Sequence, residues 1–116
     1  MTEEIEQRDI DEGYWFWVNR QIFDEYAAKI GVMGFAIYCA YSYYASFYKG
    51  DNGCWASQKQ IASRLGITIP TVSKYNKILK KNGLIHLKSG KELGRSNYIT
   101  LLRIIKDKFD EDDEGE

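Results

Sequence analysis

Hydrophobic residues recur along this chain at helical spacing in some segments and crowd together in others. Residues 20–30 place Ile22, Phe23, Tyr26, Ala27 and Ile30 in one apolar stripe, which predicts a helix capped by Asn19. Residues 31–48 carry no charge, and this near-continuous hydrophobicity predicts a second helix that is covered on more than one side. The aromatic run YWFWV at residues 14–18 predicts a strand ahead of both helices.

Two short amphipathic helices are predicted after a turn at residues 49–53 and a brief extended piece at residues 54–56. Ser57 and Gln60 have the spacing of a capping box, and Gly66 suits the left-handed conformation that ends a helix. Thr68 is the N-cap expected for the next helix, where Pro70 falls in the first turn. Only the three residues 66–68 separate these helices.

Basic and apolar side chains occupy opposite faces of the helix predicted at about residues 68–82. At 100° per residue, Ile69, Tyr75, Asn76 and Leu79 fall within about 60° of Val72, whereas Pro70, Lys74, Lys77 and Lys81 lie about 140–200° from it. Many surface helices carry such a ridge only because it faces solvent. A short helix, a tight turn and a second helix with a basic ridge instead favour a helix-turn-helix, which sets its second helix in the major groove.

A hairpin is predicted after the stop signal Asn82-Gly83. Residues 84–87 and 98–102 have strand character, and the ten residues between them, KSGKELGRSN, contain two glycines and three basic side chains. A hairpin that follows a helix-turn-helix is a wing. The predicted fold is therefore mainly α with a small β-hairpin wing, a winged helix-turn-helix.

A family resemblance rests on G-C-W-A-S-x-x-x-I-A-x-x-x-G-I-T-x-x-T-V at residues 53–72 and L-x-x-x-G-L-I at residues 79–85. These runs resemble the winged helix-turn-helix domains of bacterial and phage replication-initiator and replisome-organiser proteins, and of many small transcriptional regulators. The likeness spans residues 14–102. Asn76 stands where such helices are usually apolar and Ile78 where they are usually polar, so either the helix is rotated slightly or Ile78 contacts a partner chain. Ile69-Pro70 replaces the usual polar start, which predicts apolar contacts to bases, such as a thymine methyl.

The resemblance implies binding of double-stranded DNA through the helix at residues 68–82 and a basic wing at residues 88–97. The lysines are expected on phosphates, with Thr71 and Ser73 short enough to reach base edges and the wing arginine able to enter a minor groove. For the wing residues the alternative is a solvated turn. The candidate DNA-binding residues are Ser57, Lys59, Thr68, Thr71, Ser73, Lys74, Lys77, Lys81, Lys91, Arg95 and Asn97.

Charge is strongly segregated although the net charge is only −1. Residues 1–30 carry three basic and eight acidic side chains. Residues 57–106 carry eleven basic side chains and one acidic side chain, and residues 107–116 carry one basic side chain and seven acidic ones. A basic block between acidic ends favours a polyanionic partner. We expect an acidic segment at residues 1–13, the folded domain at residues 14–103 and a disordered acidic tail at residues 104–116, which either competes for the basic face or only aids solubility.

Several functional classes are not indicated. Cys39 and Cys54 lie fifteen residues apart without a CxxC spacing, and His86 is the only histidine, so neither a metal site, a disulfide framework nor a catalytic pairing is predicted. We therefore expect a protein that is not an enzyme and has no cofactor.

The acidic start is unlike a targeting peptide, which predicts a cytoplasmic protein. Five tyrosines, two serines and two glycines dilute residues 31–48, so we expect a core helix there rather than a membrane span. The excess of apolar surface predicts a homodimer through Trp15 and Trp17 or through residues 31–48. The alternative to DNA binding is a protein-interaction module on a winged-helix scaffold.

Overall fold

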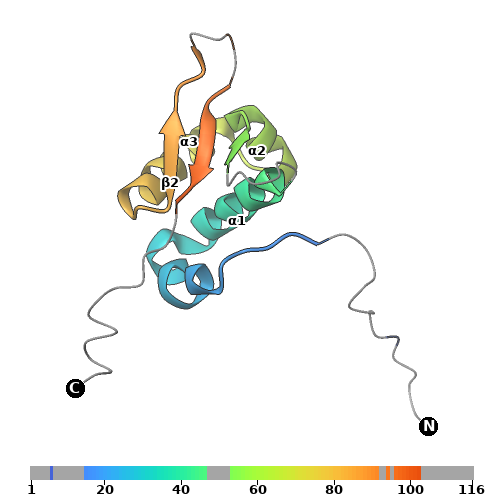
Figure 1. The fold of residues 1–116 in the computed structure, drawn as a ribbon, viewed down its shortest axis with the longest axis vertical. Helices are drawn as coiled ribbons and strands as arrows, with labels where there is room; N and C mark the ends of the chain where they lie inside the picture. The colour runs from blue at the N-terminus through green and yellow to red at the C-terminus, as the bar shows by residue number, and fades with distance from the viewer. Residues whose placement is uncertain (1–5, 7–14, 47–52, 92–93, 95, 103–116) are drawn as a thin grey trace.

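Three α-helices and a small antiparallel sheet make up the described part of the chain (Figure 1). The structure is a computed structural model that describes residues 6, 15–46, 53–91, 94 and 96–102. In chain order the elements are the π-helical segment η1 (Ile22–Tyr26), α1 (Ala27–Ala45), β1 (Gly53–Trp55), α2 (Gln58–Leu65), α3 (Ile69–Lys81), β2 (Ile85–Lys88) and β3 (Tyr98–Leu101). The prediction of a mainly helical winged helix-turn-helix is confirmed.

The predicted strand at residues 14–18 is wrong for residues 15–18, which form no regular element, while Tyr14 lies outside the described residues. An aromatic run favours a strand only when a neighbouring strand supplies hydrogen-bonding partners. The sheet has the order β1-β3-β2 and does not include this segment. Phe16 packs instead on Tyr43 of α1, with ring centroids 5.7 Å apart and the rings nearly perpendicular.

Helical structure begins at Arg20, where the Gln21 backbone N–H donates to Asn19 Oδ1 at 2.7 Å and so confirms Asn19 as the cap. The next five residues, Ile22–Tyr26, are π-helical, which the sequence did not predict. Because a π-helix bonds residue i to i+5, it changes which side chains share a face. Ile22 and Ile30 are buried as predicted, whereas Phe23 is exposed and leaves the expected stripe.

A break at Gly31 separates the two N-terminal helical segments where the sequence placed their boundary. Gly31 has φ 81° and ψ 165° inside α1, a conformation open essentially to glycine alone. The helix then continues to Ala45, and residues 47–48 of the predicted span lie outside the described residues, as do residues 49–52 of the predicted turn. No helix in the described residues is long and apolar enough to cross a membrane.

The remaining part of α1 is the centre of the core. Ile37 and Tyr41 are fully buried, and α1 packs against α2, α3, β1 and β3. Figure 1 shows it running beneath the sheet, with α2 and α3 at its side. Gly34 allows close approach to α3, because a Cβ there would meet the Tyr75 ring at 3.3 Å. A helix without charges therefore has neighbours on several sides, as predicted.

The sheet joins the predicted hairpin to a third strand. Ile85 to Lys88 pair with Leu101 to Tyr98 in antiparallel register, which confirms the hairpin. β1 pairs with the other edge of β3, with Cys54 opposite Ile99. Both of these side chains are buried beneath the sheet.

Candidate nucleic-acid interface

The predicted caps of α2 and α3, and the glycine turn between these helices, are present. Ser57 Oγ accepts the Gln60 backbone N–H at 3.0 Å, and Gln60 Oε1 accepts the Ser57 N–H at 2.9 Å, which completes the capping box. Gly66 ends α2 in the left-handed region at φ 69°. Thr68 caps α3 by accepting the Thr71 backbone N–H at 3.3 Å, and Pro70 lies in the first turn.

The far end of α3 is closed by a glycine motif. Gly83 has φ 73°, the Gly83 N–H donates to Lys80 O at 2.9 Å, and the Leu84 N–H donates to Leu79 O at 3.0 Å. These are the two bonds of a Schellman motif, which satisfies carbonyls at a helix end and turns the chain into β2. Both ends of α3 are therefore capped without the lysine side chains, of which Lys74 places its ammonium over the Tyr75 ring, 5.4 Å from the centroid.

The two faces of α3 are separated as predicted. Val72, Asn76 and Leu79 are buried, whereas Lys74, Lys77 and Lys81 are exposed. We call these three side chains the lysine ridge. Lys80 is also exposed, and residues 53–91 contain no Asp or Glu in the sequence. The ridge therefore stands on an acid-free stretch of chain.

Two isoleucines of α3 differ from the sequence prediction. Ile69, assigned to the apolar face, is 44% exposed, because it lies in the first turn, beyond the core reached by Val72. Ile78, where a partner contact was one alternative, is half-buried and packs on the chain's own core. Exposure of Ile69 leaves an apolar side chain at the N-terminal end of the outer surface of α3.

The hydroxyl groups expected near DNA bases are partly engaged within the chain. Thr68 Oγ1 and Thr71 Oγ1 lie 2.7 Å apart in a hydrogen bond, and Thr71 is half-buried. Ser73 is half-buried as well. Of the predicted residues at 68–82, Thr68 and the lysines are thus exposed, whereas Thr71 and Ser73 are half-buried.

The residues predicted in the wing are only partly described. Lys91 is exposed, its backbone N–H donates to Ser89 Oγ at 3.2 Å, and its carbonyl accepts the Gly94 N–H at 3.0 Å. Asn97 is half-buried just before β3, and Arg95 lies outside the described residues. In Figure 1 the chain leading from β2 into the wing projects beyond the helices.

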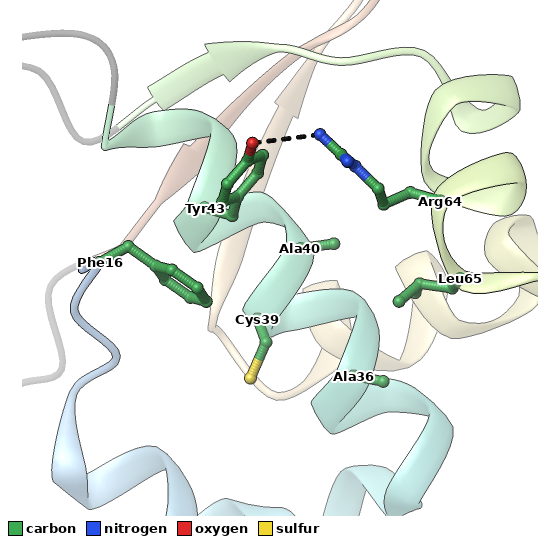
Figure 2. A pocket seen from close by; sticks show the side chains of 7 residues that line it. All are labelled: Phe16, Ala36, Cys39, Ala40, Tyr43, Arg64 and Leu65. Atoms are coloured by element: carbon green, nitrogen blue, oxygen red, sulfur yellow. Dashed lines mark hydrogen bonds between the residues drawn. The ribbon is translucent and has the colours of Figure 1, made fainter. Parts of the chain in front are cut away.

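Arg64 is a basic residue of this region that was missing from the predicted set. Its guanidinium lies over the Tyr43 ring, 4.9 Å from the centroid, and donates to Tyr43 Oη at 3.1 Å (Figure 2). The ring of Tyr44 is also close, with its centroid 5.8 Å from the guanidinium, and hydrogen bonding to Tyr44 is the largest cause of the raised pKa of Arg64. In the sequence Arg64 is a lone arginine in the last turn of α2. Its tyrosine partners lie on α1, so the local pattern did not single it out.

Lys59, also on α2, borders one surface hollow together with Arg64. It is exposed, and the hollow is lined by Tyr44, Lys59, Gln60, Ser63 and Arg64. Lys59 and Arg64 thus border the same hollow on α2. Ser57 is half-buried at the start of this helix, with its hydroxyl used in the cap.

A buried polar pair joins α1 to α3. Tyr41 Oη donates to Asn76 Oδ1 at 2.7 Å, while Asn76 Nδ2 is buried without a hydrogen-bond partner among the described residues. Burial raises the pKa of Tyr41 to about 12. Asn76 is an unusual residue for a core position, and its buried partner is Tyr41 of α1, which was not predicted from the sequence.

Residues 41–85 match a protein family described as a helix-turn-helix domain. The matched segment runs from the C-terminal part of α1 through α3 to the first residue of β2. This chain carries a winged helix-turn-helix. The hairpin of β2 and β3 follows α3 as the wing and, apart from Ile85, lies outside the matched segment. No curated protein matches the chain. In the described residues, no group of three or more His, Cys, Asp or Glu side chains could hold a metal ion.

Proposed function

We propose that this chain binds double-stranded DNA, with α3 in the major groove and the wing beside it. The observation that carries the proposal is the lysine ridge, which faces away from the core on the second helix of a helix-turn-helix domain. In such domains the second helix contacts bases and the first crosses the backbone. Replication initiation and transcriptional regulation are both compatible with this function.

Phosphate contacts supply most of the proposed affinity. Lys74, Lys77 and Lys81 are exposed on one side of α3, and no Asp or Glu within residues 53–91 competes for them. Lys59, at the start of α2, and Lys91, in the wing, extend the same charge to neighbouring elements, with Arg95 and Asn97 as further wing contacts. Each lysine that neutralises a phosphate releases condensed counterions, so binding weakens as salt rises.

Base contacts come from the N-terminal half of α3. Ser73 is the candidate for a hydrogen bond to a base edge, and the exposed Ile69 suits the methyl group of thymine. Thr68 and Thr71 hold one another through their hydroxyls, so their role combines the helix cap with contacts to the DNA backbone. This division makes the lysines responsible for affinity and Ser73 and Ile69 for preference among sequences.

The test is the salt dependence of duplex affinity, measured by fluorescence anisotropy with a duplex of mixed sequence. We expect log K to fall with log salt at a slope of roughly −3 to −5 per protomer. Lys77→Ala should flatten the slope by about one unit and weaken all duplexes alike, whereas Ser73→Ala should act unevenly across sequences. Lys29→Ala is the matched control, because Lys29 is an exposed lysine on α1 beside Tyr26.

A protein-interaction module is the second candidate function, favoured by the exposed aromatic side chains of residues 15–17 and Phe23. The double variant Lys74→Ala, Lys77→Ala separates the two. If this folded variant keeps wild-type affinity for duplexes at low salt, the ridge serves solubility and the DNA-binding assignment of α3 is wrong. Equal losses in Lys29→Ala and Lys77→Ala would also contradict it, because the effect would then reflect net charge alone.

A further inference from the structure

An apolar hollow of about 350 Å³ lies between α1, α2 and the segment that precedes η1 (Figure 2). We call it the α1–α2 hollow. It is open to the surface, and burial of the Cys39 thiol in its wall raises the pKa of that group. Its lining residues are Phe16, Ala36, Cys39, Ala40, Tyr43, Arg64 and Leu65. None of the residues proposed to contact DNA takes part in it.

The neighbouring residues Phe16 and Trp17 have opposite surroundings. Phe16 lines the hollow and packs on Tyr43, whereas Trp17 is 87% exposed. In the described structure Phe16 is in the wall of the hollow while Trp17 stays in solvent. An occupant of the hollow that leaves both side chains as they are therefore comes from another molecule.

We propose that the α1–α2 hollow receives Trp17 of a second copy of this chain, and that two copies form a two-fold symmetric dimer. In such a dimer each copy supplies one Trp17 and one hollow, so the contact closes on itself. Tryptophan suits the site because it supplies a large apolar surface. Its ring also meets the guanidinium of Arg64, which already lies over Tyr43, and a cation over an aromatic face is attractive.

The exposed aromatic side chains supply much of the apolar area that a dimer needs. Trp15, Phe16, Trp17 and Phe23 are between 39% and 87% exposed. With ~150–250 Å² for each aromatic side chain, they present roughly 500 Å² to solvent. A standard interface buries about 800 Å² per partner, so these side chains would form most of one.

Charge is complementary as well. The chain that leads to Trp17 carries six acidic side chains and one arginine within residues 1–13. Lys59 and Arg64 lie together on α2, and Arg64 also borders the α1–α2 hollow. A partner segment anchored by Trp17 therefore brings acidic residues toward a basic edge. This favours a second copy of the chain over an uncharged apolar peptide.

The first test is mass against concentration, by light scattering without DNA, from micromolar to hundreds of micromolar. The wild-type protein should approach twice the monomer mass. Trp17→Ala should raise the dimer dissociation constant at least about 30-fold, as expected for loss of an aromatic anchor. Ile69→Ala, which truncates an exposed apolar side chain on α3, is the matched control and should leave the constant unchanged. A monomeric wild-type protein at the highest concentration would overturn the proposal.

Filling the hollow gives an independent test. Ala36→Phe places a ring in the α1–α2 hollow and leaves Trp17 intact, so it should also produce a monomer with wild-type circular dichroism. A mixture of Trp17→Ala and Ala36→Phe should associate more than either variant alone, because one Trp17 and one open hollow remain. If both single variants dimerise as the wild type does, another surface forms the dimer and the proposal is wrong.

Cys39 reports occupancy of the hollow directly. Its alkylation by iodoacetamide, located by mass spectrometry, should slow as protein concentration rises, and Trp17→Ala should remove this concentration dependence. Cys54 is fully buried and serves as an internal control for unfolding. A rate for Cys39 that is independent of concentration in a dimeric wild-type protein would place the interface elsewhere.

Discussion

The helices α1 and α3 pack against each other, but they differ in how much of their surface is buried. From Gly31 to its end α1 has no charged side chain, and it is covered by α2, α3, β1 and β3. α3 buries only one face, and its lysines stand on the other. The fold therefore depends on α1 all round but on α3 from one side only, which leaves the outer face of α3 free for a binding partner.

The largest effect should distinguish the two faces of α3. Leu79 is fully buried, and Leu79→Ala should lower the free energy of unfolding by ~2–5 kcal/mol, through lost burial and the cavity it leaves. Lys77→Ala, two residues earlier on the exposed face, should stay within about 0.5 kcal/mol of wild type. Urea denaturation of both variants measures the difference. Similar losses for the two would mean that the lysine face is part of the folded core.

The break in α1 is the next point to test. Gly31→Ala should cost about 1–3 kcal/mol, because φ 81° with ψ 165° is almost closed to other residues. A Cβ at Gly31 would lie 3.8 Å from Tyr75, an ordinary contact, so strain rather than collision is the cause. Gly66→Ala is the comparison, with open space around its Cβ and a left-handed conformation that L-residues adopt more readily. Thermal unfolding should show the larger loss for Gly31→Ala, and the reverse order would contradict this account.

The smallest effect concerns the polar bond that joins the two helices. Tyr41→Phe leaves Asn76 Oδ1 buried without its donor and should cost about 1.5 kcal/mol. Asn76→Leu added to Tyr41→Phe should recover most of this loss, because both polar partners are then replaced by apolar groups. A double-mutant cycle in urea measures the coupling. Simple addition of the two single losses would show that the bond contributes nothing to the contact between α1 and α3.

Features set by neighbouring residues were predictable from the sequence. The capping box at Ser57, the cap at Thr68 and the stop after Lys81 depend on side chains within a few positions, and all three are confirmed. The same holds for the hairpin of β2 and β3. The lysine ridge was predictable from helical periodicity alone, because the position of the apolar face determines which residues lie on the opposite, solvent-exposed face.

Other features depend on contacts between distant parts of the chain. Residues 15–18 have the composition of a strand but lack a strand to pair with, and Phe16 packs on α1 instead. The position of Phe23 changed because the first turns are π-helical. The tyrosine partner to which Arg64 donates lies 21 residues earlier, on α1, and β1 pairs with β3, which comes much later in the chain.

The sequence by itself therefore determined the order of the helices, their caps and turns, and the face of α3 that carries charge. Each of these follows from side chains that lie within one or two turns of one another. Only the tertiary structure decided that Asn76 meets Tyr41, that Arg64 lies over Tyr43, and that Trp17 is left exposed beside an apolar hollow. These outcomes depend on how α1 packs against α2 and α3, and local hydrophobic pattern does not specify which side chains meet across that packing.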